Sequence, residues 1–202
     1  MKFAIIYGVH MIKLNGMKKD TIKIVLLGSL PKGDNARKTF IDWKQEYIEK
    51  IKKAIPQAIF IHGDLISDKE GSEVVVGHDL WLVKHADIVI VHATAKIGAG
   101  TAQEIVLAKA FKKPVISVIP KDTHHRKSNV VFHGTLLEDW IHPFLDVSSD
   151  AVAENIDEVI TWIKKYILNP TKIKDFSVFD NSIATFEKKL PKTLTEYIKK
   201  GW

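Results

Sequence analysis

The chain of 202 residues contains no cysteine. This absence excludes disulfides, thiolate catalysis and metal sites held by thiolates, and it is compatible with a reducing cytoplasm, where we expect the protein to reside. Nine histidines are present, but His124, His125, His133 and His142 show no spacing that is typical of metal ligands. We therefore expect neither a metal ion nor another cofactor.

Long apolar runs are also missing. No stretch reaches the roughly 18 residues that a membrane-spanning helix needs. Residues 1–16 contain a short apolar patch but no small-residue cleavage signature, so we expect no signal peptide. The sequence thus predicts a protein without a membrane partner.

Basic residues are numerous but do not cluster. The net charge of +6 comes mostly from lysines that are spread along the chain. Scattered lysines are typical of solvated helix faces. An anionic small ligand is the second interpretation, and nucleic acid, which favours clustered basic residues, is the third.

Near-continuous runs of valine and isoleucine alternate with segments of helical periodicity. Such strands are typical of a parallel sheet that helices cover on both faces, because both faces of each strand are then buried. The sequence therefore predicts an α/β protein with a Rossmann-like or flavodoxin-like sheet. The expected strands are residues 22–29, 58–63, 87–93 and 114–120, and the expected helices between them are residues 37–53, 72–85 and 101–111.

The second half of the chain is less regular. Residues 121–135 are interpreted as a polar loop, and residues 150–167 carry one apolar stripe that predicts a last helix packed on the sheet. Two weakly amphipathic stretches follow, in a tail that is expected to fold over the domain or over a neighbouring subunit. We expect three parts: an N-terminal extension or hairpin at 1–16, an α/β domain at 17–168 and a C-terminal helical tail at 169–202.

Ligands of an open parallel sheet bind outside the carboxyl ends of the strands. The segment "GSLPKGDNAR" (28–37) follows the first expected strand, and its glycines let backbone amides approach a ligand closely. Lys32 or Arg37 could meet an anionic group of that ligand. A plain strand-to-helix connection is the alternative interpretation of this segment.

Asp79 lies beside the apolar stripe of the expected helix 72–85, about one turn from Val76 and Val83. A carboxylate in that place either lies at the solvent edge or loses hydration and needs a partner. Partial burial would raise its pKa and suit it to proton transfer.

The segment "GAGTAQE" (98–104) also permits two interpretations. Thr101 and Glu104 have the spacing of a capping box at a helix N-terminus. Glu104 in a first helical turn would also be kept anionic by the helix dipole, as a nucleophile requires. Together with Asp79 it suggests paired-carboxylate chemistry at a glycosidic carbon.

Three segments occur in a characteristic order: "KIVLLGSL", then "HDLWLVKHADIVIVHA", then "GAGTAQEIVLAKAFKKPVISVIP". The most specific features are an aspartate eight positions before the "AD", a G-x-x-x-E helix start and the "KPV". Over roughly residues 22–130 the chain resembles the nucleoside 2-deoxyribosyltransferase family, which includes 2′-deoxynucleoside 5′-monophosphate N-hydrolases.

This resemblance implies a role for each matching residue. Glu104 falls at the nucleophile that forms a covalent deoxyribosyl intermediate, and Asp79 at the aspartate that assists proton transfer to and from the base. The implied partners are a nucleoside or nucleotide, a free base, and further copies of the chain in a homodimer or higher oligomer, because the family shares active sites between subunits. The expected substrate-binding residues are Gly28 and Ser29 at the sugar, Lys32, Arg37, Gly98 and Gly100, and Ser128 and Asn129 in a loop that reaches a neighbouring subunit's site.

Two positions depart from the family pattern. Val25 stands where family members often have a tyrosine near the sugar, and Gly98 where they have an acidic residue or a phosphate-binding serine. The sequence therefore leaves three functions open: deoxyribosyl transfer, hydrolysis of a deoxynucleoside monophosphate, and nucleotide binding without turnover. The pattern G-x-G-T-x-x-E is also similar to the lysine-decarboxylase-like phosphoribohydrolases, but the "PGG" of that family is missing here.

Overall fold

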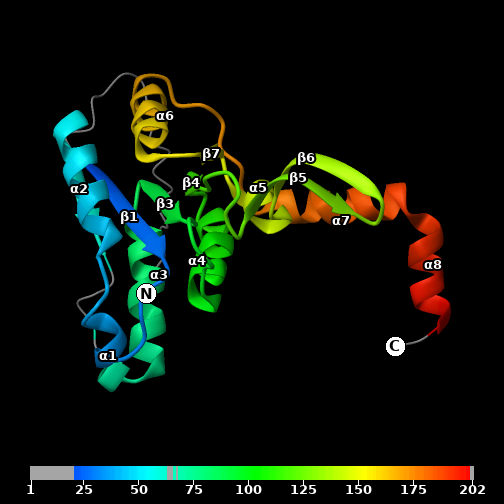
Figure 1. Cartoon of the computed structure of the whole chain (residues 1–202), viewed down its shortest axis with the longest axis horizontal. Coiled ribbons are helices and arrows are strands. Elements are labelled where there is room, and N and C mark those ends of the chain that lie inside the picture. The colour runs from blue at the N-terminus through cyan, green and yellow to red at the C-terminus, as the bar shows by residue number, and fades with distance from the viewer. Residues whose placement is uncertain (1–20, 63–65, 67, 201–202) are drawn as a thin grey trace, which may run out of the picture.

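The computed structural model describes residues 21–62, 66 and 68–200, so the extension or hairpin expected at residues 1–16 lies outside the described part of the chain. A five-stranded parallel sheet forms its centre, with the strand order β2-β1-β3-β4-β7 (Figure 1). This is the order of the flavodoxin-like fold, and the predicted fold class is confirmed. The strands are β1 (Ile22–Gly28), β2 (Ala58–Ile61), β3 (Ile88–His92), β4 (Val115–Val118) and β7 (Ala151–Ala153).

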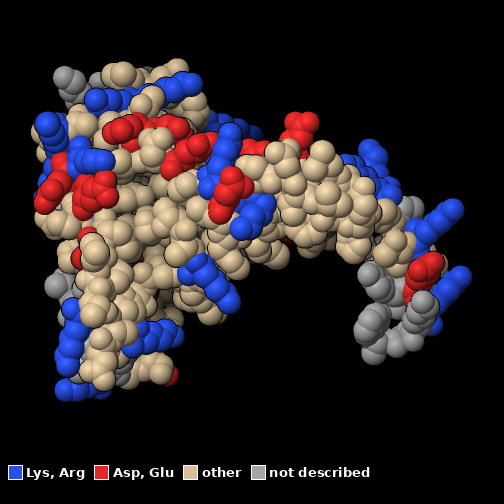
Figure 2. Space-filling view, viewed as in Figure 1, with Lys and Arg blue, Asp and Glu red and all other residues tan. Residues whose placement is uncertain are grey.

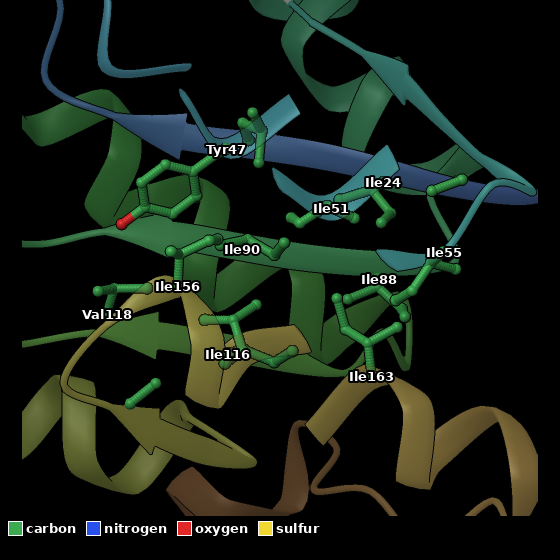
Figure 3. Packing of buried hydrophobic residues seen from close by; sticks show 14 of the residues in the cluster. Ile24, Tyr47, Ile51, Ile55, Ile88, Ile90, Ile116, Val118, Ile156 and Ile163 are labelled. Atoms are coloured by element: carbon green, nitrogen blue, oxygen red, sulfur yellow. The ribbon is translucent and has the colours of Figure 1, made fainter. Parts of the chain in front are cut away.

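The core has two halves, one on each face of the sheet. Alternation along β1 sends Ile24 and Leu26 to one face and Val25 and Leu27 to the other. Helices α2 (Trp43–Ala54) and α6 (Ile156–Leu168) cover the first face, whose packing is shown in Figure 3. Helices α3 (Ser72–His85) and α4 (Ala99–Ala110) cover the second face.

The helix expected at 37–53 is divided in two. A single turn, α1 (Asp34–Arg37), is followed by a break, and α2 begins only at Trp43. Asp42 sets this start, because its side chain accepts a hydrogen bond at 3.0 Å from the backbone N–H of Lys44. A 3₁₀ turn, η1 (Asp68–Glu70), precedes α3, whose bounds agree with the prediction.

The interpretation of residues 121–135 as a polar loop is wrong. Strands β5 (Arg126–Phe132) and β6 (Thr135–Ile141) form an antiparallel hairpin that extends away from the sheet (Figure 1). Its two-residue turn, His133-Gly134, has positive φ at both positions, as a type I′ turn requires. The strands were not recognised because most of their side chains are exposed, so no alternation of buried and polar residues marks them.

The helix expected to begin near Asp150 starts six residues later. The Asn155 side chain accepts hydrogen bonds from the backbone N–H groups of Asp157 and Glu158, and this cap fixes the start of α6. The preceding residues instead form β7, which pairs with β4 at the edge of the sheet. Between the hairpin and β7 lies a short helix, α5 (Pro143–Ser148), that the sequence did not predict.

The tail contains α7 (Ser177–Lys189) and α8 (Pro191–Lys200). Helix α7 contacts α5 and, like the hairpin, extends away from the sheet, while α8 lies at the far end (Figure 1). None of the side chains of α7 is buried. Within the described residues, no helix combines the length and apolar character needed to cross a membrane.

Candidate active site

The carboxyl ends of β1 and β3 lie side by side, with Gly28 opposite His92. The chain leaves these two strands toward opposite faces of the sheet, to α2 and to α4. Ligands of open parallel sheets bind at such a point, and we call this place the crevice. Gly28 has no room for a side chain, because a Cβ there would lie 2.7 Å from the ring of Trp43 and 3.2 Å from His92. The crevice therefore begins at a residue that must be glycine.

Two hydrogen bonds join the end of β1 to the segment that follows β3. The Ser29 hydroxyl donates to the carbonyl of Lys96 at 2.5 Å, and the Thr101 hydroxyl donates to the carbonyl of Gly28 at 3.4 Å. Thr101 is buried in this place. These contacts hold the first turn of α4 against β1.

The capping box expected at Thr101 and Glu104 is not present. Helix α4 begins at Ala99 with Gly98 as its N-cap, and no side chain caps it. Thr101 is therefore the third residue of the helix and bonds β1 instead. Glu104 lies in the second turn, beyond the first turn in which the helix dipole acts most strongly.

The Glu104 carboxyl is largely buried on α4. Burial, and second to it the negative charge of Asp79, raise its pKa from 4.5 to about 7. Glu104 is therefore only partly ionised at pH 7, and its place beyond the first turn limits what the helix dipole contributes to the anionic form. No hydrogen bond or ion pair from elsewhere in the described chain reaches this carboxyl.

Asp79 approaches Glu104 from α3, and the two helices are in contact. Its side chain is 40% exposed, and its Oδ1 lies 3.2 Å from Nδ1 of the neighbouring His78. Asp79 is therefore near enough to act on the ionisation of Glu104 and is itself open to solvent. The arrangement combines a buried carboxyl with a second, accessible carboxyl.

The glycines of the β3–α4 connection leave space beside this pair. Gly98 and Gly100 are exposed, and nothing lies within 4 Å of the position that a Cβ would take at either residue. Val25, where a family tyrosine was considered, is buried in the core on the α3 and α4 side of the sheet. Glycine at both positions leaves room for a ligand, but Val25 does not line the crevice.

The two expected anion-binding residues are exposed. Lys32 lies in the connection after β1, and Arg37 ends α1, with its Nε 3.5 Å from the carbonyl of Pro31. Within the described residues, neither cation is paired with a carboxylate. Both remain accessible to an anionic ligand.

Ser128 and Asn129 lie on β5 and not in a loop. The backbone N–H of Ser128 donates to Asp122 at 2.9 Å, and Asn129 is exposed. The hairpin that carries them leaves the sheet (Figure 1), so the structure does not bring them to Asp79 and Glu104 of the same chain.

Sequence reasoning missed an aromatic cluster at the crevice. The His92 ring stacks on Trp43 at 4.2 Å between centroids and meets Tyr47 edge-on at 5.5 Å. Burial lowers the pKa of His92 to about 4, so the ring is neutral at pH 7. The only signal in the sequence was a histidine at the end of an apolar strand, because Trp43 reaches it from another element.

Comparison with known proteins gives little further information. No protein-family model matches the chain, and no curated protein matches it. Among solved structures it is similar to the CMP N-glycosidase BcmB of Clostridium botulinum, with a TM-score of 0.39 and 13% identity over 71% of this chain and 99% of that one. Function has to be argued from the site itself.

Proposed function

We propose that the protein cleaves or transfers at the N-glycosidic bond of 2′-deoxynucleosides through a covalent deoxyribosyl intermediate on Glu104. The observation that carries this proposal is the buried Glu104 carboxyl, with a pKa of about 7, beside Asp79 at the carboxyl end of the sheet. Substitution at a sugar carbon is typically carried out by two neighbouring carboxyl groups.

The reaction would proceed in two displacements at C1′. Ionised Glu104 attacks C1′, and the electron pair of the N-glycosidic bond leaves with the base, which takes a proton delivered by Asp79. A second base or a water molecule then attacks C1′ and releases the Glu104 carboxylate, and the attacking base or water gives up its proton to Asp79. The half-exposed position of Asp79 suits this exchange, because the proton can be replaced from solvent.

The raised pKa of Glu104 would also suit a proton donor. Trapping the covalent deoxyribosyl intermediate therefore has to decide whether Glu104 is the nucleophile or the proton donor. Wild-type protein is mixed with a deoxynucleoside, quenched in acid, digested and analysed by mass spectrometry. A deoxyribosyl group on the peptide with Glu104 is expected, and the same adduct on Asp79 would reverse the assignment. Tight binding without base release from any natural deoxynucleoside or its monophosphate would instead favour a nucleotide-binding module.

A 5′-monophosphate is the second candidate substrate. The observation in its favour is that Lys32 and Arg37 are exposed and, within the described residues, unpaired with acids. Each deoxynucleoside is compared with its 5′-phosphate in one chromatographic assay, for wild type and for Lys32→Met. A preference for the phosphate that Lys32→Met removes supports this substrate, whereas equal rates exclude phosphate recognition.

We also propose that the protein works as a homo-oligomer in which Ser128 and Asn129 enter a neighbouring subunit's site. The hairpin exposes Val131 and Leu136 by 61% and 57%, and Figure 2 shows few charged side chains over it on the visible face. Exposed apolar surface of this kind is typical of an interaction site.

Mass measurement and subunit mixing test the shared site. Val131→Asp with Leu136→Asp should lower the mass measured by light scattering, whereas the control Ile41→Asp, at a position that is 88% exposed on the sheet domain, should not. Mixing Glu104→Gln with Asn129→Ala subunits should restore part of the activity. A wild-type protein with the mass of a monomer contradicts the proposal.

A further inference from the structure

A second cavity lies apart from the candidate active site. Its volume is about 700 Å³, and it is enclosed by α4, α5 and the base of the hairpin. Ala102, Gln103, Ile105, Val106 and Leu107 line it from α4, and two of these, Ala102 and Val106, lie on the side of the helix opposite Glu104. Neither Glu104 nor Asp79 is among the lining residues.

The walls of this cavity are mostly apolar. Val106 and Leu107 of α4 face Phe144 and Leu145 of α5 across it. A concave apolar space of this size matches the pockets that hold small organic ligands. The remaining question is which polar group such a ligand would carry.

His125 provides a polar group whose hydrogen position can be derived. Its ring is 5% exposed, and its Nε2 accepts a hydrogen bond at 3.2 Å from the backbone N–H of Ile97. Burial, followed by the neighbouring His124 and His142, lowers its pKa to about 4, so the ring is neutral at pH 7. Because Nε2 is the acceptor, the single ring hydrogen is on Nδ1.

The Nδ1–H of His125 is buried, and no atom of the described residues accepts its hydrogen bond. A buried donor without an acceptor is costly and rare, which indicates an acceptor that the described residues do not supply. Nδ1 of His142 is also buried without a partner in this part of the protein, and the two rings lie 5.7 Å apart. Both histidines line the cavity.

The charges around the cavity favour an anion. Lys96 lines it together with three histidines, whereas no aspartate or glutamate does. The histidines are not arranged as a metal site, because no group of three or more possible ligand side chains was found among the described residues. A ligand head with negative charge would meet one cation and no anionic side chain here, beside neutral polar groups from Gln103, Ser148 and the histidines.

We propose that this cavity binds a small carboxylate with an apolar body. The head lies near Lys96 at the His125 end of the cavity, where one carboxylate oxygen accepts the Nδ1–H of His125 once the ring turns toward the ligand, because this atom is buried in the structure. The apolar body packs between α4 and α5. The site is joined to the crevice through the β3–α4 connection, since Ile97 donates to His125 and the carbonyl of Lys96 accepts from Ser29. The proposal does not depend on the reaction assigned to Glu104.

The test uses two matched probes on the full chain, 4-phenylbutyrate and the neutral 4-phenylbutan-1-ol. Binding is followed by calorimetry and by backbone and histidine-ring ¹H–¹⁵N spectra. We expect the carboxylate to bind at least about tenfold more tightly than the alcohol, to shift the amides of residues 102–107 and 144–145, and to shift the Nδ1–H signal of His125. Lys96→Met should remove most of the difference between the probes and leave the alcohol unaffected.

Variants of the histidine separate binding from folding. His125→Phe should weaken the carboxylate at least about tenfold, whereas the control His85→Phe, which alters a surface histidine of α3 outside the cavity, should not. If His125→Phe does not fold, the Lys96→Met result and the wild-type ring spectra decide. Four results would overturn the proposal. The first two are saturation of binding only above tens of millimolar and equal affinity for both probes. The others are a His125 ring hydrogen on Nε2, and cavity amide signals that shift on dilution without a probe, as binding of a second copy of the chain would cause.

Discussion

Helix α4 carries two ionisable side chains five residues apart, the fully buried Lys109 and the partly buried Glu104, and their surroundings are opposite. The Lys109 ammonium is fully buried and donates to the Asp150 carboxylate, to the carbonyl of Lys113 at 3.0 Å and to the carbonyl of Lys174 at 3.3 Å. Burial lowers the pKa of Lys109, but three acceptors compensate the charged form. Glu104 has no such partners within the described residues, and its ionisable neighbour Asp79 has the same charge.

The difference separates a structural charge from a candidate functional one. Asp150 also accepts from the backbone N–H groups of Val115 at 2.7 Å and Lys174 at 2.6 Å, so the pair joins α4, β4 and the start of the tail. The Glu104 carboxyl, by contrast, connects no elements of the fold, and its burial destabilises the ionised form. A buried, uncompensated carboxyl at the edge of a crevice is the pattern that active sites retain.

The largest expected effect is the loss of activity in Glu104→Gln. Removing the proposed nucleophile should lower kcat/KM by on the order of 10⁴- to 10⁶-fold, the range found when single catalytic groups of an enzyme are removed. The free energy of unfolding at pH 8 should stay equal or rise, because the amide needs no buried charge. Base release and urea unfolding measure the two quantities, with Glu73→Gln, an exposed acid on α3, as the matched control. If Glu104→Gln loses stability together with activity, Glu104 is a structural charge like Lys109.

Asp150→Ala should have the largest effect on stability. It leaves the Lys109 ammonium buried without its counter-charge and two backbone donors without an acceptor, which should cost about 3–5 kcal/mol in the free energy of unfolding. Activity per folded molecule should change little. Urea unfolding measures the loss. Asp150→Asn removes the charge and turns one of the two accepting oxygens into an N–H donor, so it should lose the ion pair and at least one of the backbone hydrogen bonds. A loss below about 1 kcal/mol would show that the ion pair is not structural.

Strands β1 to β4 and helix α3 could be predicted from the sequence, whereas β5 to β7 and the contrast between Lys109 and Glu104 could not. Buried Val/Ile runs mark a parallel sheet because both faces need apolar side chains, and Ser72–His85 carried its own helical pattern. Lys109 gave no sign of burial, because its partners come from Asp150 and the tail. The start of α4 was misplaced, since Gly98 caps the helix without a side chain. Candidate residues were therefore identifiable, but their ionisation depends on tertiary neighbours.

The pH dependence of stability gives a smaller, signed effect. Glu104 has a pKa of about 7 in the folded chain and 4.5 as its ordinary value, so between these pH values the folded state binds more protons than the unfolded state. The free energy of unfolding should therefore fall as pH rises from 4.5 to about 7, by about 3 kcal/mol in total, and not fall further from this group above pH 7.

The comparison of wild type with Glu104→Gln isolates this contribution. The difference between their unfolding free energies, measured in urea at several pH values, should change across this range and be constant above it. If Glu104 acts as the ionised nucleophile, kcat/KM of the wild type should rise over the same pH range. A pH-independent difference would mean that Glu104 is solvated like an ordinary surface acid.

The smallest expected effect concerns the charge of Asp79. Asp79→Asn removes the like charge but leaves Glu104 buried, so the pKa of Glu104 should fall toward 4.5 without reaching it. Because burial is the larger of the two causes, the fall should be less than half of the displacement from 4.5 to about 7. Side-chain ¹³C shifts of Glu104, followed from pH 4 to pH 9, measure it directly. A complete return of the Glu104 pKa to 4.5 would mean that the charge of Asp79 alone raises it. Glu104 and Lys109 would then differ in the charge of their neighbours and not in the loss of hydration.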